Sequence, residues 1–541
     1  MMKLVTVSEM QQVEREADAN GLTYAQMMEN AGASLAEIIH FEFGGDAPGR
    51  ALALTGSGNN GGDALVALTW LASRGWWTAA YLVRPREPGD PLVERLKQAG
   101  GEVLSHEEDQ NCAQLEALLE RSSLLLDGVL GTGIRLPLKQ EVAEVLGFVG
   151  DWLEHKPGAL KVVAVDCPSG VDCDSGQTAL ECLRADLTVT MAAVKQGLLK
   201  FPAADFIGEL RIGNIGNLEN LKSWNSITRY VADENWVRQI LPPRPRTAHK
   251  GTFGTALIVA GSVNYTGAAW LAGQAAYRCG AGLVTLAVPY PLHAALAGQF
   301  PEATWLLLPD ELGVIAEEAV SVVQEGMKRA TALLVGPGFG LEETSLRFLD
   351  GLLGASAAPR KAIGFAPQVK DAASEEQTSL PPLVIDADGL KLVSRLKDWQ
   401  KRLPSPSVLT PHPGEMAVLT GLEKEELMAD RIATAEHFAH KWGHVVVFKG
   451  AFTVIASPDG RTAIIPVATP ALARAGTGDV LAGLIVGLRA QGVQAYEAAV
   501  AGAYLHAQAG LQAARELGST AAVLAGDVLR AVSSQMAVYG R

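Results

Sequence analysis

Short apolar segments that end in glycine-rich loops alternate along the chain with segments of helical periodicity. The apolar segments begin at residues 51, 78, 123, 162 and 186 in the first half, and at residues 255, 283, 332, 383, 407 and 444 in the second half. Between them lie segments such as DALVALTWLASRG from Asp63 and DVLAGLIVGLRAQG from Asp479, whose apolar residues recur at helical spacing. Because parallel strands need a crossover helix between them, this alternation predicts an α/β fold with mostly parallel sheets and helices on both faces.

The alternation breaks once, at a proline-rich and basic segment. IGNIGN from Ile212 closes the first series, and LPPRPRTAHKG from Leu241 is typical of a linker or domain-entry loop. A chain of 541 residues is also too long for one core, because single domains usually hold about 100–200 residues. We therefore predict two three-layer αβα domains over residues 1–225 and 226–541, with a surface insertion at residues 361–381 where periodicity is lost.

Composition limits the classes of binding partner and the cellular compartment that we expect for this chain. The formal net charge of −14 argues against a nucleic-acid or anionic-membrane binder, since such proteins normally display basic surfaces. No stretch reaches the length of about 18 uninterrupted apolar residues that a membrane span needs, and the polar N-terminal segment lacks the apolar centre of a signal peptide. The five cysteines include no C-x-x-C pair, which is typical of reduced thiols. We expect a cytoplasmic protein that binds small molecules, and the sequence leaves a homo-oligomer open.

The glycine-rich loop Gly56–Asp63, GSGNNGGD, follows the first apolar segment. Its glycines let the backbone approach a phosphate, and the N–H groups at the start of the following helix favour an anion. Because the loop also satisfies G-x-G-x-x-G, a dehydrogenase with Arg84 recognising a 2′-phosphate is one alternative, although no hydride-transfer site accompanies it. A tight turn without a ligand is another alternative. The side chains of Asn59, Asn60 and Asp63 favour a polar ligand or an ion in addition to a phosphate.

Two further strand ends carry polar residues. Asp127 precedes a glycine-rich turn, and Asp166 and Ser169 follow the next apolar segment. Each aspartate alone is typical of a turn or a helix cap. In an open α/β sheet, however, ligands bind at the carboxyl ends of the strands, so we expect these loops to meet the Gly56–Asp63 loop in one crevice.

Four motifs of the first half, taken in order, resemble those of the NAD(P)H-hydrate epimerases. They are MMENAG from Met27, GSGNNGGD from Gly56, DGVLGTG from Asp127 and DCPSGVD from Asp166, and the resemblance covers about residues 1–220. It implies a Rossmann-like domain that interconverts the R and S hydrates of NADH and NADPH (NADHX and NADPHX), with Asp166 as the acid–base group. The residues implied to bind the hydrate are Asn59, Asn60, Gly61, Gly62, Asp63, Gly131, Thr132, Gly133, Ile134, Arg135, Leu136, Pro137 and Asp166, and those implied to hold a potassium ion are Asn60, Asp127 and Ser169. Lys195 matches a lysine of that family, which either assists Asp166 or is merely solvated.

A carboxyl group suits this reaction. C6 of the hydrated nicotinamide bears a hydroxyl beside the ring nitrogen, whose lone pair can expel it. A carboxylic acid protonates the departing hydroxyl, and its conjugate base then activates water for return to either face. The remaining alternative is that the first half only binds a ligand and regulates the second.

The most specific motif of the second half is GTGD, residues Gly476–Asp479, directly before a long apolar helix. The backbone N–H groups of such a loop surround developing phosphate charge, and a carboxylate beside them is placed to take a proton from a hydroxyl. Asp479 as a simple helix cap is the structural alternative. The whole segment resembles the anion hole and base of ribokinase-fold kinases. Lys449 at a strand end suits nucleotide phosphates, and the H-x-x-E spacing of His412 and Glu415 resembles the magnesium motif of sugar kinases, with histidine in place of asparagine.

Three longer segments of the second half are similar to the NAD(P)H-hydrate dehydratases, a branch of the ribokinase superfamily. They begin at His249, Leu334 and Ile385, and the similarity covers about residues 235–541 apart from the insertion. It implies contacts to the hydrate from Ala268, Gly338, His412 and Asp479, contacts to the nucleotide from Lys449, Gly450, Ala451, Phe452, Thr453 and Gly478, and support from Asp386 and Asp388. It also implies Mg²⁺ as cofactor together with ADP, the donor of the bacterial fused enzymes, or with ATP.

The resemblance implies a two-step dehydration. Asp479 deprotonates the C6 hydroxyl, the terminal phosphoryl of the nucleotide is transferred to it, and phosphate then leaves with help from the ring nitrogen. With ADP as donor the products are AMP, phosphate and NADH or NADPH. A ribokinase-like kinase of a vitamin precursor, which would release a stable phosphorylated product, is the enzyme alternative.

Overall fold

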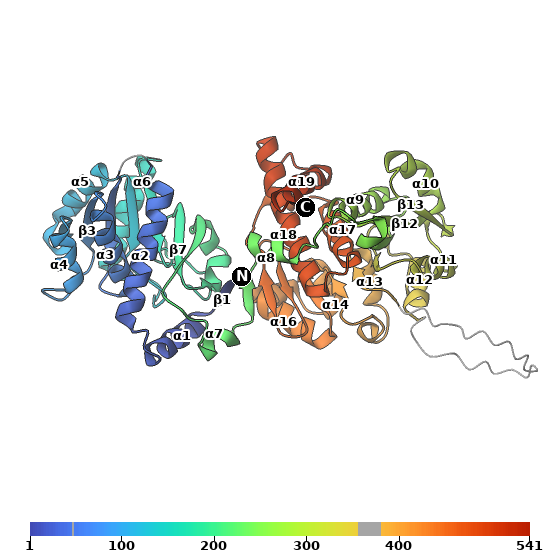
Figure 1. Cartoon of the computed structure of the whole chain (residues 1–541), viewed down its shortest axis with the longest axis horizontal. Helices are drawn as coiled ribbons and strands as arrows, with labels where there is room; N and C mark the ends of the chain where they lie inside the picture. The colour runs from blue at the N-terminus through green and yellow to red at the C-terminus, as the bar shows by residue number, and fades with distance from the viewer. Residues whose placement is uncertain (46–47, 355–379, 541) are drawn as a thin grey trace, which may run out of the picture. The chain divides into compact units, whose positions relative to one another are not determined.

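The computed structural model describes residues 1–45, 48–354 and 380–540, and the chain divides into two compact units (Figure 1). One unit spans residues 2–229 and the other begins at residue 230, and each has its own hydrophobic core. The insertion expected at residues 361–381 lies outside the described residues except for its last two positions.

The sheet of the first unit has seven strands, and neighbouring strands are parallel throughout. In spatial order they are β4 (Glu102–Ser105), β3 (Trp77–Leu82), β2 (Arg50–Thr55), β5 (Leu124–Gly128), β6 (Lys161–Val165), β7 (Leu187–Met191) and β9 (Glu209–Gly213). A short strand β1 (Met2–Val5) pairs separately with β8 (Val194–Lys195). The chain moves outward in one direction from β2 to β4 and in the other from β5 to β9. Such a reversal opens a crevice at the carboxyl ends of β2 and β5, where an open α/β sheet binds ligands.

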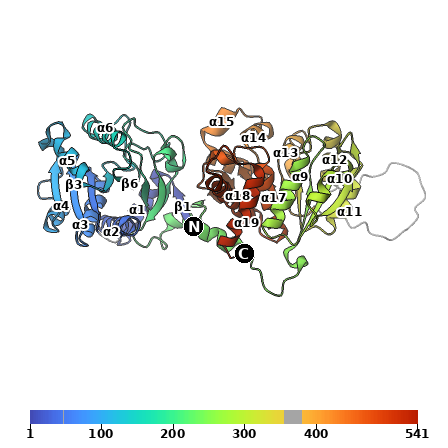
Figure 2. The ribbon, with the colours of Figure 1, turned by 90° about the horizontal axis from the view of Figure 1, so that it is seen from above.

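Helices cover both faces of this sheet, as the alternation of apolar segments predicts. α1 (Val7–Ala19), α2 (Tyr24–Phe43), α3 (Asn59–Ala72) and α4 (Pro91–Gln98) belong to the core on one face, α5 (Ala113–Arg121) and α6 (Gln140–His155) to the core on the other, and α7 (Lys222–Ser226) follows β9. Successive strand residues alternate between the two cores, so that Ala53 of β2 faces α2 and α3 while Leu54 faces α5 and α6. In Figure 2, α6 lies above strands β3 and β6, and α2 and α3 lie below them.

The second unit is built on a longer sheet. Its strands run in the order β13 (Thr304–Leu308), β12 (Leu283–Pro289), β11 (Thr255–Val259), β16 (Ala332–Val335), β17 (Leu383–Ile385), β18 (Val408–Leu409), β19 (Val445–Phe448), β20 (Val454–Ala456), β21 (Thr462–Ile464) and β10 (Arg229–Val231). The strands from β13 to β19 are parallel, which confirms the expected mostly parallel sheet. β20 and β21 continue it in antiparallel pairing, and β14 (Asp310–Glu311) and β15 (Val314–Ile315) form a separate hairpin. Because β16 to β19 are consecutive parallel neighbours, their carboxyl ends meet at one sheet edge.

Two sets of helices enclose this sheet. α8 (Glu234–Ile240), α9 (Thr266–Arg278), α17 (Thr477–Ala490), α18 (Ala495–Leu517) and α19 (Ala525–Val538) pack over one face. α10 (Tyr290–Leu296) contacts β12 and β13, while α11 (Ala319–Met327), α12 (Glu343–Gly354), α13 (Asp388–Val393), α14 (Pro413–Thr420), α15 (Lys424–Ala429) and α16 (Arg431–Trp442) form a contiguous series outside that core. α17 is apolar on nearly all sides because it lies between α9, α18 and the strands. Within the described ranges, no helix is long and apolar enough to cross a membrane.

Candidate active sites

A cavity of about 790 Å³ lies in the first unit at the carboxyl ends of β2, β5 and β6. The residues that line it include Glu14, Tyr24, Met27, Met28, Asn59, Asn60, Asp63, Arg84, Arg86, Gly131, Thr132, Gly133, Ile134 and Asp166. All four motifs that resemble the epimerases therefore meet in one place. A cavity of this size with convergent polar groups is typical of a small-molecule site.

The expected binding residues 59–63 form the first turns of α3, which begins directly after Gly58. Both asparagines and the aspartate of this segment line the cavity, whereas its two glycines are buried in the packing of the helix. A Cβ on Gly61 would lie 2.1 Å from the carbonyl oxygen of Gly56, and one on Gly56 would lie 2.0 Å from that of Val129. These glycines therefore allow the helix start to lie beside the loop after β5, with its first N–H groups at the cavity.

The loop after β5 contributes only its first part to the cavity. Residues 131–134 line the cavity, whereas residues 135–137 are not part of its lining. A Cβ on Gly131 would lie 2.3 Å from Asn60 Oδ1, so a glycine is required where this loop meets α3. Contacts of residues 135–137 with a ligand stay a prediction.

Asn60, Asp127 and Ser169 come together around Leu130. Ser169 donates its backbone N–H to Asp127 Oδ2 over 2.7 Å, and Asn60 Nδ2 donates to the carbonyl oxygens of Leu130 at 3.2 Å and Val165 at 2.6 Å. Asp127 is fully buried, which raises the pKa of its carboxyl, and its Oδ1 has no hydrogen-bond partner among the described residues. A buried carboxylate oxygen without a donor, next to amide, hydroxyl and carbonyl oxygens, fits a hard cation such as K⁺.

Asp166 is held by a buried lysine at the edge of the cavity. It follows β6 with a φ of 64°, a strained conformation for a non-glycine residue that often marks functional positions. Its Oδ1 accepts hydrogen bonds from the N–H of Met191 at 2.8 Å, the hydroxyl of Thr190 at 3.2 Å and the ammonium of Lys195. The Lys195 side chain is 1% exposed, so the alternative of a solvated lysine is wrong. A buried charge without a partner is costly, so Asp166 and Lys195 compensate each other's charge. The ion pair therefore holds both side chains in place.

Glu14 on α1 also lines the cavity, and the sequence analysis missed it. Its carboxyl is close enough to Asp166 and Lys195 to feel both charges, and burial raises its pKa. The sequence did contain a signal for Glu14. This residue lies on the same helical face as Val13 and Ala17, which are buried. A carboxylate on the apolar face of an amphipathic helix indicates a role in the interior.

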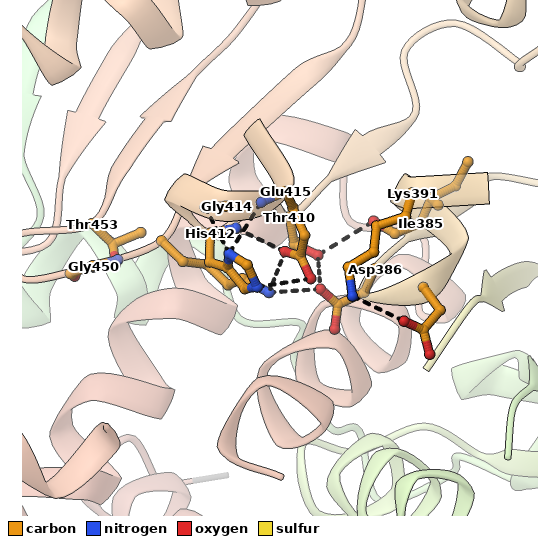
Figure 3. A network of polar contacts seen from close by, with 11 residues as sticks. Ile385, Asp386, Lys391, Thr410, His412, Gly414, Glu415, Gly450 and Thr453 are labelled. Carbon is orange, nitrogen blue, oxygen red and sulfur yellow. Dashed lines mark hydrogen bonds and ion pairs between the residues drawn. The ribbon is translucent and has the colours of Figure 1, made fainter. Parts of the chain in front are cut away.

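Three neighbouring strands of the second unit end in polar residues that form one network (Figure 3). Asp386 follows β17, Thr410 follows β18 and Lys449 follows β19. Lys449 Nζ donates to Asp386 Oδ1 at 2.8 Å and lies 3.5 Å from Glu415 Oε2, while the Thr410 hydroxyl donates to Asp386 Oδ1 at 2.6 Å. Although burial opposes it, the two carboxylates raise the pKa of Lys449. The sheet edge therefore holds a fixed ammonium suited to nucleotide phosphates.

The GTGD segment begins α17 next to this network. Gly476 has a φ of 86° and precedes the helix, whose first N–H groups have no partner within the helix itself. A Cβ on Gly478 would lie 3.7 Å from Lys449 Nζ, so the segment lies against the ammonium. Burial raises the pKa of Asp479 to about 7, and its carboxyl forms no hydrogen bond with the described residues. The alternative of Asp479 as a simple helix cap is wrong, because Gly476 occupies the capping position.

His412 caps α14 within the same network (Figure 3). Its Nδ1 accepts from the N–H groups of Gly414 at 3.0 Å and Glu415 at 3.1 Å, and Glu415 Oε2 accepts from the His412 N–H at 2.8 Å. The histidine ring remains half exposed, whereas Glu415 is buried. The H-x-x-E motif thus forms a capping box. The carboxylate of Glu415 is bound to protein groups, including Lys449.

Ala268 and Gly338, two of the expected hydrate contacts, lie against each other. Gly338 has a φ of 67° in the loop after β16, and a Cβ there would lie 2.9 Å from Ala268 Cβ. The N–H of Gly340 in the same loop donates to Asp388 Oδ2 at 3.1 Å, which ties the loop to the next strand end. α9, which carries Ala268, packs on α17, which carries Asp479. The structure therefore brings the ends of β16 and β17 to the start of α17.

The expected nucleotide-binding residues 449–453 form the turn between β19 and β20. Arg431, at the start of α16, donates from its guanidinium to the carbonyl oxygens of Phe448 at 2.9 Å and of Ala451. Burial lowers the pKa of Arg431 to about 10. The sequence analysis missed Arg431 because no local pattern links it to a turn about 20 residues later.

Comparison with known families and solved structures matches both units. The model of the NAD(P)H-hydrate dehydratases matches residues 256–533, and the model of the YjeF-related protein N-terminus matches residues 24–197. A crystal structure of the ADP/ATP-dependent NAD(P)H-hydrate dehydratase from Bacillus subtilis, co-crystallised with ATP and Mg²⁺, is 28% identical with a TM-score of 0.47. That similarity covers 57% of this chain and 98% of the Bacillus chain.

Curated relatives match over nearly the whole chain. The bifunctional NAD(P)H-hydrate repair enzyme Nnr of Moorella thermoacetica is 36% identical over 535 residues, which cover 98% of this chain and 95% of that protein. The enzyme of the same name from Escherichia coli is 31% identical, covering 95% of this chain and 90% of that protein. The chain therefore belongs to the family of bifunctional NAD(P)H-hydrate repair enzymes.

Proposed function

We propose that the first unit interconverts the R and S hydrates of NADH and NADPH at C6, and that the second unit dehydrates the S hydrate with a nucleotide as phosphoryl donor. The observation that carries the proposal is that each unit has its own carboxylate at a sheet edge. Asp166 borders the cavity, and Asp479 lies at a helix start beside Lys449. A mixture of the protein, racemic NADH hydrate, ADP and Mg²⁺ should recover the full NADH absorbance. Release of a stable phosphorylated hydrate would instead indicate a kinase.

In the first unit, Asp166 takes part in proton transfer at the oxygen bound to C6. Departure of the hydroxyl, assisted by the ring nitrogen, leaves a planar carbon to which water returns on either face. Lys195 fixes Asp166 through Oδ1, and the described residues leave Oδ2 without a hydrogen bond, available to the substrate. K⁺ held by Asn60, Asp127 and Ser169 would supply positive charge next to the phosphate-binding loops.

In the second unit, Asp479 takes the proton of the C6 hydroxyl, and the hydroxyl oxygen attacks the terminal phosphorus of the nucleotide. The N–H groups at the start of α17 and the Lys449 ammonium stabilise the charge on the transferred phosphoryl. The C6–O bond then breaks with its electron pair on phosphate, the nitrogen lone pair replaces it, and loss of a C5 proton forms the ring double bond. Among the described residues, no group of three or more histidine, cysteine or acidic side chains could hold a metal ion, so Mg²⁺ would enter with the nucleotide, where it would neutralise phosphate charge.

ADP should support dehydration, with AMP and phosphate as products. The transfer needs one phosphoryl group on a good leaving group, and ADP provides it. Chromatography of nucleotides after reaction of the S hydrate with ADP and Mg²⁺ measures AMP against NADH formed, and AMP offered as donor is the matched control. Recovery of NADH with ATP and none with ADP would overturn the donor assignment while leaving the reaction intact.

Asp127→Ala should slow epimerisation and remove its dependence on potassium, because the substitution deletes the buried oxygen that lacks a donor. Asp127→Asn keeps the shape and removes the charge, and should do the same. R-to-S conversion in KCl and in NaCl measures the effect, and the shift of the first unit's unfolding midpoint with K⁺ provides a readout besides activity. Asp151→Ala, on the exposed side of α6, is the control. An unchanged potassium response in both Asp127 variants would mean that the ion binds elsewhere.

We also propose a cytoplasmic location. All five cysteines are free, and all five are buried. A reducing compartment keeps thiols in this state, which supports the cytoplasm as the place of work.

A further inference from the structure

Three carboxyl groups line the cavity of the first unit, and the buried ammonium of Lys195 binds one of them, Asp166. Glu14 comes from α1, Asp63 from α3 and Asp166 from the end of β6. Lys195 and Asp166 both act electrostatically on Glu14, and Asp166 and Glu14 both act on Asp63. The proposed epimerisation uses only one of these carboxyl groups.

Hydrogen bonds are divided unequally among the three carboxyl groups. Three donors, from Thr190, Met191 and Lys195, converge on one oxygen of Asp166. The carboxyl groups of Glu14 and Asp63 receive no hydrogen bond from the described residues, and burial raises the pKa of both. A carboxyl group with three donors suits the role of proton acceptor, whereas one that is partly or fully buried without donors suits the role of proton holder.

Inversion at C6 requires oxygen to leave from one face and to return to the other. A single side chain that is locked by a buried lysine reaches one position, whereas groups on two elements can serve two positions. Asp63 is 7% exposed and is part of the phosphate-binding helix start, while Glu14 is only half-buried. Glu14 is therefore the better placed partner of Asp166 in the open part of the cavity.

We propose that Glu14 donates the proton to the departing C6 hydroxyl and that Asp166 accepts the proton of the returning water. The proposal rests on the epimerase function proposed above for this unit. The Glu14 proton moves to the hydroxyl oxygen, the C6–O bond breaks with its electron pair on the water released, and the nitrogen lone pair forms a C6=N bond. Water then adds to the other face, its proton passes to Asp166, and the electron pair returns to nitrogen. Proton exchange from Asp166 to Glu14 through solvent restores the starting state.

Glu14→Gln in the full chain tests the proposal. Chromatography of R and S after incubation of the R hydrate without nucleotide should show a rate lowered by about 10²–10⁴, with KM nearly unchanged. The parental rate should fall at high pH because the acid must hold its proton, and Glu14→Gln should lack that fall. The groups that face Glu14 and shape this titration are Arg15, Asp63, Asp166 and Lys195. Glu14→Asp should regain part of the rate, and Glu37→Gln, exposed on α2, should match the parent.

Several outcomes would overturn the proposal. A parental rate for Glu14→Gln together with a large loss for Asp63→Asn would assign the proton to Asp63. A lowered rate of Glu14→Gln with an unchanged pH profile would mean that Glu14 has only a structural role. The unfolding midpoint of Glu14→Gln should equal that of the parent, which excludes misfolding as the cause of a lowered rate. If the parental chain itself fails to interconvert the hydrates, the epimerase function is wrong, and the role of Glu14 is wrong with it.

Discussion

Asp479→Asn should lower the rate of dehydration of the S hydrate by about 10²–10⁴, while the R and S hydrates continue to interconvert. Asparagine keeps the shape of the side chain and removes its ability to take a proton. Burial raises the pKa of Asp479 to about 7, which suits a base that works near neutral pH. The parental rate should therefore rise with pH up to about 7 and level off above it. Recovery of NADH absorbance at saturating nucleotide measures both effects.

Asp398→Asn is the matched control for this substitution. Asp398 is exposed in the second unit, where its ion pair with Lys401 lies at the surface at 3.5 Å. This control should keep the parental rate and the parental pH profile. Normal NADH production by Asp479→Asn, or a parental rate that falls as pH rises towards 7, would contradict the role of Asp479 as the base.

Asp166→Asn should leave a chain that converts only the S half of a racemic hydrate quickly. Loss of the acid–base group should slow epimerisation by about 10²–10⁴, so the R half then depends on spontaneous epimerisation. The substitution also leaves the Lys195 ammonium buried without its partner. Because an unpaired buried charge costs about 3–5 kcal/mol, the unfolding midpoint of the first unit should fall as well. Chromatography of the two epimers during the reaction shows the first effect, and thermal denaturation shows the second.

Asp166→Asn combined with Lys195→Met separates chemistry from stability. The double variant removes both charges, so it should regain part of the lost stability while epimerisation remains slow. Dehydration of the S hydrate should stay at the parental rate in both variants, because Asp479 lies in the other unit. If either variant consumed both epimers at the parental rate, Asp166 would not be the acid–base group.

Local patterns were sufficient for most strands and for the loops that follow them. The segments Gly56–Asp63 and Gly476–Asp479 each carry their signal within eight residues, and both form a turn into a helix start as expected. The antiparallel strands β20 and β21 were not predicted, because segments of three residues are too short to show a period. The edge strands β4 and β9 were also missed, since they lack the continuous apolar runs of central strands. The edge strand β13 was missed although its sequence TWLLL is largely apolar.

Pairings between distant side chains could not be predicted in the same way. Lys195 meets Asp166 across 29 residues, and Lys449 meets Asp386 across 63 residues. Lys449 meets Asp386 because β17 and β19 end at the same edge of one sheet, and Lys195 meets Asp166 because the chain turns from β7, the neighbour of β6, into the short strand β8. Neither arrangement is encoded in local periodicity. For the same reason Glu14 could be noticed only as an anomaly on an apolar helix face.

The presence of two complete cores and two sites in one polypeptide has a consequence for gene dosage. Translation of a single message makes both active sites in equal numbers, whatever the level of expression. The ratio of the two catalytic capacities is then set by turnover numbers alone and cannot drift with the regulation of separate genes. A rise or fall in expression therefore changes the removal of both epimers by the same factor. Neither epimer accumulates because one of the two active sites was made in smaller amounts than the other.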